Sequence, residues 1–241
     1  MTEATLITND ARFSRQSAII HPDLADAQVL VAGVGMLGSF TALALAHCVK
    51  HVAVWDMDSV EDVNMGNQAY NATHYGLPKG KALEAMCAGF PLSSEFARFP
   101  LDKAPSELLP HTLEGRKLIV VSGVDSLAVR GELANYARHH GADYFVDTRA
   151  MGDVAVILIV PPDQIERYLR DELPKDEDVP DVPCGMNGTA YIGSFVAGKV
   201  VASLNASMRG VRVPFIRVED VNMGVVLHEA ALEEEVVKKE E

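Results

Sequence analysis

Cysteine is scarce in this sequence of 241 residues, which contains only Cys48, Cys87 and Cys184. No two of them form a C-x-x-C pair, so a zinc site built from four cysteines is excluded. A sparse, odd number of cysteines is typical of a reducing compartment. There is no 18-residue apolar run, no signal-peptide pattern, and the longest helix-like apolar stretch, 40–49, is too short to cross a bilayer. The sequence therefore predicts a soluble, cytoplasmic protein.

Basic residues are also in the minority, because 21 Lys and Arg face 34 Asp and Glu and give a net charge of −13. Binding to nucleic acid needs clustered Lys and Arg, so we expect neither a nucleic-acid nor a membrane partner. Apolar residues make up 48% of the chain, enough for a large core. We predict a single nucleotide-binding unit over 1–241, with flexible ends at 1–9 and 230–241.

The stretch 28–58 carries the clearest functional pattern. An apolar run at 29–32 is followed by Gly33, Gly35 and Gly38 in the spacing G-x-G-x-x-G, then by a helix pattern and a second apolar run that ends at Asp56. In such a unit the first glycine allows a tight turn. The second lets the backbone approach a phosphate, and the third lets the helix pack on the strand. The helix start attracts an anion, and Asp56 can accept hydrogen bonds from a ribose. We interpret this unit as a nucleotide site.

Apolar and amphipathic segments alternate along the rest of the chain. The predicted strands are 29–32, 51–55, 95–101, 117–122, 144–146 and 154–160, with one or two more in 213–228; the predicted helices are 10–21, 39–49, 79–89, 126–140, 163–172 and 187–207. An exposed loop is expected at 173–183. This alternation predicts an α/β fold with a Rossmann-like, doubly wound, mostly parallel sheet and antiparallel C-terminal additions. Ligands of such sheets bind beyond the carboxyl ends of the strands, where the glycines, Asp56, Asp125 and Arg149 all fall.

Six short motifs occur in order and at characteristic spacing. They are RFSRQ at 12–16, GVGMLG at 33–38, DMDSVEDVN at 56–64, Gln68, GLPK at 76–79 and DSLAVR at 125–130. With these motifs the chain resembles the ThiF/MoeB/HesA family, the bacterial relatives of ubiquitin-activating enzymes. The resemblance is close over 10–150 and looser over 151–241. It implies ATP- and Mg²⁺-dependent adenylation of the C-terminal carboxylate of a small ubiquitin-like or sulfur-carrier protein, which many members then pass to a thiol.

The resemblance also implies roles for individual residues. Asn64 and Lys79 match family residues near the phosphates, and Gln68 matches a family glutamine. Asp125 matches the acid that holds Mg²⁺, with Arg130 as its structural support. Arg15 matches an arginine that reaches into the site of the partner subunit, which implies a homodimer with two composite sites.

One position departs from the family pattern. The family has N-x-x-R-Q where this chain has Asn64-Met65-Gly66-Asn67-Gln68, so Asn67 replaces an arginine that contacts phosphate. Loss of such a contact can slow phosphoryl chemistry by orders of magnitude. Either the chain is a weak or inactive homologue, or another cation substitutes. Our candidate is Arg149, for which a salt bridge with Asp147 or Asp153 is an equal alternative.

Cys184 lies in a loop-like context, VPCGMNG, before a predicted helix. A helix start lowers the pKa of a thiol, so Cys184 is either a nucleophile that forms a thioester or a partly buried structural cysteine. Cys48 and Cys87 lie on apolar helical patterns and are expected in the core.

Three functions therefore remain. The first is ATP-dependent adenylation of a small protein, with Arg15, Lys79, Asp125 and Cys184 as its catalytic residues. The second is a binding subunit with little or no activity, favoured by Asn67. The third is an NAD-dependent oxidoreductase, because the glycine-rich unit alone does not distinguish ATP from NAD.

Overall fold

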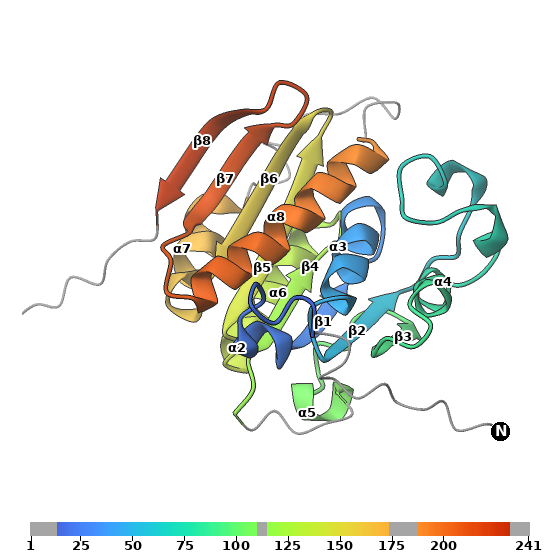
Figure 1. Cartoon of the computed structure of the whole chain (residues 1–241), viewed down its shortest axis with the longest axis horizontal. Helices are drawn as coiled ribbons and strands as arrows, with labels where there is room; N and C mark the ends of the chain where they lie inside the picture. Colours follow the sequence, from blue (N-terminus) through green and yellow to red (C-terminus); the bar gives the residue numbers. More distant parts are fainter. Residues whose placement is uncertain (1–13, 110–114, 174–187, 232–241) are drawn as a thin grey trace, which may run out of the picture.

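The structure, a computed structural model, describes residues 14–109, 115–173 and 188–231. They form an eight-stranded sheet in the order β3-β2-β1-β4-β5-β6-β7-β8 (Figure 1). The strands are β1 Gln28–Ala32, β2 His51–Asp56, β3 Leu92–Phe96, β4 Leu118–Ser122, β5 Tyr144–Met151, β6 Val154–Val160, β7 Pro214–Asp220 and β8 Val225–Ala231. Pairing is parallel from β3 to β5 and antiparallel from β5 to β8. The predicted α/β fold class is confirmed.

Helices cover both faces of this sheet. The longer ones are α3 Met36–Ala46, α4 Lys79–Met86, α6 Leu127–His139 and α8 Ala190–Met208; the short ones are α2 Pro22–Ala25, α5 Pro105–Leu108 and α7 Ile165–Arg167. Side chains of α3 and α8 belong to the apolar core on one face, and those of α6 and α7 to the core on the other. In Figure 1, α3 and α8 lie side by side in front of the sheet.

Burial explains why the central elements were recognisable in the sequence. All five residues of β1 and of β4 are buried, as expected for parallel strands covered on both faces. On α8, Ile192, Val196, Val200 and Leu204 recur every fourth residue and are all buried, which is the stripe of a helix that packs on a sheet. In the described part of the chain, no helix is long and apolar enough to cross a membrane.

Two predicted elements at the margins were wrong. The third strand is β3 and not 95–101, because its parallel register begins at Val52 opposite Leu92. It is the edge strand, four of its five residues are not buried, and its sequence LSSEF lacks an apolar run. The described part of the predicted helix 10–21 forms turns before the short α2.

The fifth strand was predicted too short. The residues Asp147, Thr148 and Arg149 lie inside β5 and do not end it, because β5 and β6 pair antiparallel from Phe145 opposite Val160 to Met151 opposite Val154. Cross-strand pairing thus carries the strand through polar residues that would otherwise indicate a loop.

The remaining predictions fall near their elements or outside the described residues. The predicted helix 163–172 is a run of short pieces, namely the 3₁₀ turn η3 Pro162–Gln164, α7 and the π turn η4 Tyr168–Glu172. The predicted strands in 213–228 are β7 and β8. Of the predicted flexible ends 1–9 and 230–241, residues 230–231 belong to strand β8 and the others lie outside the described residues, as do almost all of the loop 173–183 and Cys184.

Candidate functional site

The loop after β1 turns tightly because two glycine contacts bring backbone against backbone. Gly33 has φ +81°, in the left-handed region that favours glycine. A Cβ on Gly33 would lie 2.8 Å from the carbonyl carbon of Gly123, the residue after β4, and a Cβ on Gly38 would lie 3.0 Å from the carbonyl carbon of Gly33 and nearer still to its oxygen. The first and third glycines of the motif are therefore required by packing, as the sequence predicted.

Among the described residues, nothing crowds Gly35 at the start of α3. The first amides of a helix have no partner within the helix and carry partial positive charge. Gly35 is the N-cap of this 11-residue helix and makes no side-chain capping bond. A Cβ at Gly35 would meet no other described atom within 4 Å. Packing within the described chain thus leaves Gly35 unexplained, whereas an anion approaching the amides explains it.

Asp56 is held beside this loop by backbone amides. Its Oδ2 accepts a hydrogen bond from the Val34 amide at 2.7 Å, and its Oδ1 accepts one from the Asp58 amide at 2.8 Å. The Tyr70 hydroxyl donates to the Val34 carbonyl at 2.7 Å, and burial together with Asp56 raises the pKa of Tyr70. A carboxylate has about four acceptor positions, so Asp56 can also accept from a ribose.

Lys79 lies near the same end of β2. Its amide donates to the carbonyl of Asp58 at 2.9 Å, and its Nζ lies 2.9 Å from Oδ2 of Asp58. The Lys79 side chain is only 8% exposed, whereas that of Asp58 is 62% exposed. The nearly buried ammonium of Lys79 is thus paired with the exposed carboxylate of Asp58, which lies two residues after Asp56.

The polar segment 59–77 lies against α3 and contains the 3₁₀ turns η1 Asp62–Asn64 and η2 Ala72–His74. The amide of Gln68 donates to the carbonyl of Asn64 at 2.9 Å, and the amide of Ala69 donates to Oγ of Ser39 in α3 at 3.2 Å. The side-chain oxygens Oδ1 of Asn67 and Oε1 of Gln68 are buried and accept no hydrogen bond from the described residues. Two unused acceptors therefore lie at this side of the candidate site.

Asp125 reaches the same edge from β4. Gly123 donates to the carbonyl of Ala32 at 2.8 Å, and Asp125 follows two residues later and is exposed. No group of three or more His, Cys, Asp or Glu in the described chain is arranged to hold a metal. Mg²⁺ usually takes only one or two carboxylates and completes its shell with phosphates and water, so a single exposed aspartate fits that ion.

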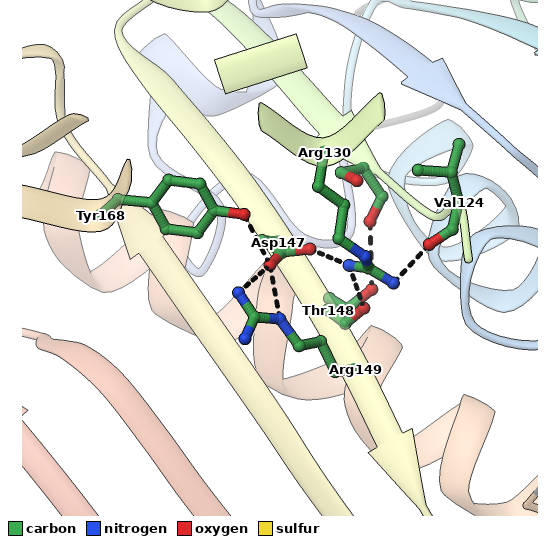
Figure 2. Close-up of polar contacts among 7 residues, drawn as sticks. Val124, Arg130, Asp147, Thr148, Arg149 and Tyr168 are labelled. Atoms are coloured by element: carbon green, nitrogen blue, oxygen red, sulfur yellow. Dashed lines mark hydrogen bonds and ion pairs between the residues drawn. The ribbon is translucent and has the colours of Figure 1, made fainter. Parts of the chain in front are cut away.

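A buried ionic cluster around Asp147 contacts the carbonyl of Val124, the residue before Asp125, through Arg130 (Figure 2). The Asp147 side chain is fully buried, and the guanidinium groups of Arg130 and Arg149 pair with it. Burial would lower the pKa of Arg149, but Asp147 and Tyr168 raise it above its ordinary value. Of the two acids that the sequence offered as salt-bridge partners of Arg149, the structure shows Asp147 in contact with it. Asp153 instead accepts a hydrogen bond from Tyr191. The sequence analysis missed Tyr168 altogether.

One predicted residue, Arg15, is not brought to this edge. Arg15 is exposed, and its neighbour Gln16 donates from Nε2 to the carbonyl of His47 at 2.8 Å. His47 is the C-cap of α3, and a helix of this length places its two ends about 16 Å apart. Arg15 therefore lies toward the far end of α3 from Gly35 in this chain. Cys184 lies outside the described residues.

Comparisons with known proteins identify the family of this chain. The ThiF family matches residues 13–230, and the chain belongs to that family. Similar solved structures include PaaA, at 16% identity and a TM-score of 0.65 over 95% of this chain and 76% of PaaA. E. coli MccB with ATP has 14% identity and a TM-score of 0.63 over 89% and 66% of the two chains. E. coli tRNA N6-threonylcarbamoyladenosine dehydratase, TcdA, has 17% identity and a TM-score of 0.61 over 83% and 95%. No curated protein matches the sequence. At these identities the solved structures show a shared fold, and the ThiF/MoeB/HesA resemblance is confirmed at the level of the family.

Proposed function

We propose that this chain, acting as one adenylation unit, uses ATP to adenylate a carboxylate. The substrate that we propose is the C-terminus of a small ubiquitin-like or sulfur-carrier protein. The observation that carries the proposal is the convergence, at one edge of the sheet, of the start of α3, Asp56, Lys79 and Asp125 in a ThiF-family chain. The crystal structure of MccB with ATP supports ATP as the nucleotide.

The chemistry places demands that these residues can meet. The substrate carboxylate forms a bond to the α-phosphorus while the bond from that phosphorus to the bridging oxygen breaks, and pyrophosphate leaves. Negative charge grows on the phosphate oxygens, where the amides at the start of α3 and the Lys79 ammonium would stabilise it. Asp56 would bind the ribose, and Asn64 and Gln68 would lie near the phosphates. Asp125 would hold Mg²⁺, which supplies neutralisation of phosphate charge when it is bound.

The acidity of the site favours a cation from a second subunit. Residues 56–64 contain four acids, and Lys79 is already paired with one of them, Asp58. Asn67 adds no charge where the family pattern has an arginine. We propose that Arg15 of the partner subunit completes the site in a homodimer, because in its own protomer Arg15 lies toward the far end of α3.

A second candidate is a binding subunit with weak or no adenylation activity. Asn67 favours it, since the buried Oδ1 of that residue accepts no hydrogen bond in the described chain and its amide cannot replace a guanidinium. The pairing of Arg149 with Asp147 also leaves less of that cation for a phosphate. Membership of the ThiF family favours ATP over the dinucleotide of an oxidoreductase.

ATP–pyrophosphate exchange with small carrier proteins that end in Gly-Gly tests the proposal. We expect magnesium-dependent exchange with one such carrier, and an increase for the variant Asn67→Arg if the missing cation limits the rate. A folded protein that binds the carrier but gives no exchange, either as wild type or as Asn67→Arg, would favour the binding subunit. Trapping a carrier thioester that is lost in Cys184→Ser would test the predicted nucleophile.

A further inference from the structure

The carboxylate of Asp147 is fixed on both of its oxygens by three other side chains (Figure 2). Oδ1 accepts from Nη1 of Arg130. Oδ2 accepts from the hydroxyl of Tyr168 at 2.9 Å and from Nε of Arg149 at 2.8 Å. Asp147 and Tyr168 are both 0% exposed. A buried carboxylate with every partner in place cannot rotate without breaking hydrogen bonds that water does not replace.

Arg130 connects this carboxylate to the loop that carries Asp125. Its Nη1 also donates to the carbonyl of Thr148 at 3.0 Å, and its Nη2 donates to the carbonyl of Val124, the residue immediately before Asp125. The guanidinium is planar, so fixing one nitrogen on Asp147 fixes the direction in which the other nitrogen points. The position of the Val124 carbonyl therefore depends on the position of Asp147.

Tyr168 brings a separate element into this chain of contacts. It is the first residue of the π turn η4, and its ring packs on Phe145 of β5 at 5.2 Å between centroids. Burial and the neighbouring Asp147 raise the pKa of Tyr168, so the hydroxyl stays protonated and donates. Single π turns inside helices are frequent at functional sites.

We propose that Tyr168 and Asp147 are positioning residues for Asp125. The Tyr168 hydroxyl orients the Asp147 carboxylate, the carboxylate orients Arg130, and Arg130 sets the backbone from which Asp125 reaches the metal. We call this series of contacts, from Tyr168 through Asp147 and Arg130 to Asp125, the relay. The inference rests on the proposed function, because the relay acts on the same nucleotide site. It differs from a general stabilising role in one respect: it predicts an effect on the metal requirement and not only on the melting temperature.

The variants Tyr168→Phe and Tyr136→Phe test this inference. Tyr136 is also buried, and its hydroxyl also makes a hydrogen bond, to the carbonyl of Lys103 at 3.0 Å, so its loss is a matched control. The measurement is the Mg²⁺ concentration that gives half of the thermal stabilisation by ATP. The loss of one hydrogen bond of ordinary strength should raise this concentration about threefold to tenfold in Tyr168→Phe, with ATP binding in the absence of metal unchanged. Tyr136→Phe should leave the midpoint where it is in the wild type.

A third variant tests whether Tyr168 and Arg130 act through the same series of contacts. Arg130→Lys keeps a positive charge opposite Asp147 but loses the fork that reaches Val124, so it should raise the Mg²⁺ midpoint as well. If the two residues act in one relay, the double variant should raise it no further than the larger single effect. Equal midpoints in Tyr168→Phe and wild type, or equal shifts in Tyr168→Phe and Tyr136→Phe, would overturn the relay alone. A wild-type protein without magnesium-dependent ATP binding would instead overturn the proposed function, and the relay with it.

Discussion

Gly38 and Gly35 belong to the same motif, but replacement by alanine should lower the stability of the fold at Gly38 and the affinity for ATP at Gly35. A Cβ at Gly38 would lie 3.0 Å from the carbonyl carbon of Gly33 and closer to the oxygen. Non-bonded heavy atoms lie about 3.5–4 Å apart, and the oxygen is closer than the carbon, so α3 or the Gly33 peptide must move by more than about 1 Å. Overpacking of this kind costs about 1–3 kcal/mol and sometimes more. Because backbone must move, we expect about 3 kcal/mol for Gly38→Ala and a melting temperature lower by about 6–12 °C.

Gly35→Ala should leave the fold nearly intact. The new Cβ meets no other described atom within 4 Å, and φ at this residue is −71°, outside the left-handed region that favours glycine. Replacing glycine by alanine at an N-cap costs about 0.5–1 kcal/mol, or at most about 4 °C. The added methyl group would stand where a phosphate must approach the amides, so the affinity for ATP should fall at least about tenfold.

Thermal unfolding and calorimetric titration with magnesium–ATP measure both effects on the same two variants. Full ATP affinity in Gly35→Ala would refute the placement of the phosphates at the start of α3. Wild-type stability in Gly38→Ala would refute the packing argument for the third glycine.

Three further substitutions test the other parts of the site. Asp125→Asn changes an exposed side chain, so the free energy of unfolding should stay within about 0.5 kcal/mol of the wild-type value. Magnesium-dependent ATP–pyrophosphate exchange should fall about a hundredfold or more. Undiminished exchange would exclude Asp125 from the site. Lys79→Ala should weaken ATP binding, because it removes a nearly buried cation, whereas Lys81→Ala removes a half-exposed one and should not; equal ATP dissociation constants would contradict the role of Lys79. Asp147→Asn leaves two guanidinium groups without a carboxylate and should cost about 3–5 kcal/mol in chemical denaturation, and a cost below about 1 kcal/mol would show that the cluster contributes little.

The central strands could be predicted from the sequence because strands that are buried on both faces appear in it as apolar runs. The runs at 29–32 and 118–121 are apolar without interruption, and both lie in strands that are buried on two faces. The edge strand β3 has no such pattern, since its sequence LSSEF is polar and mostly exposed. Its position follows from parallel register with β2, which is a tertiary property that a local pattern does not contain.

The site was predictable where its signals are local. The spacing of Gly33, Gly35 and Gly38, with Asp56 after the next strand, identifies one unit of contiguous chain. The contact between Asp147 and Tyr168 joins residues 21 positions apart, and neither position carries a motif. Asp147 and Arg149 suggested the end of a strand because they are charged, whereas β5 continues through both by pairing with β6.

A crystal structure of the protein with magnesium and a non-hydrolysable ATP analogue would be the most direct test of the nucleotide site. We expect the phosphates against the amides at the start of α3, the ribose on Asp56, and the Asp125 carboxylate on the metal. Phosphates bound elsewhere, or an Asp125 side chain turned away from the metal, would contradict the proposed site.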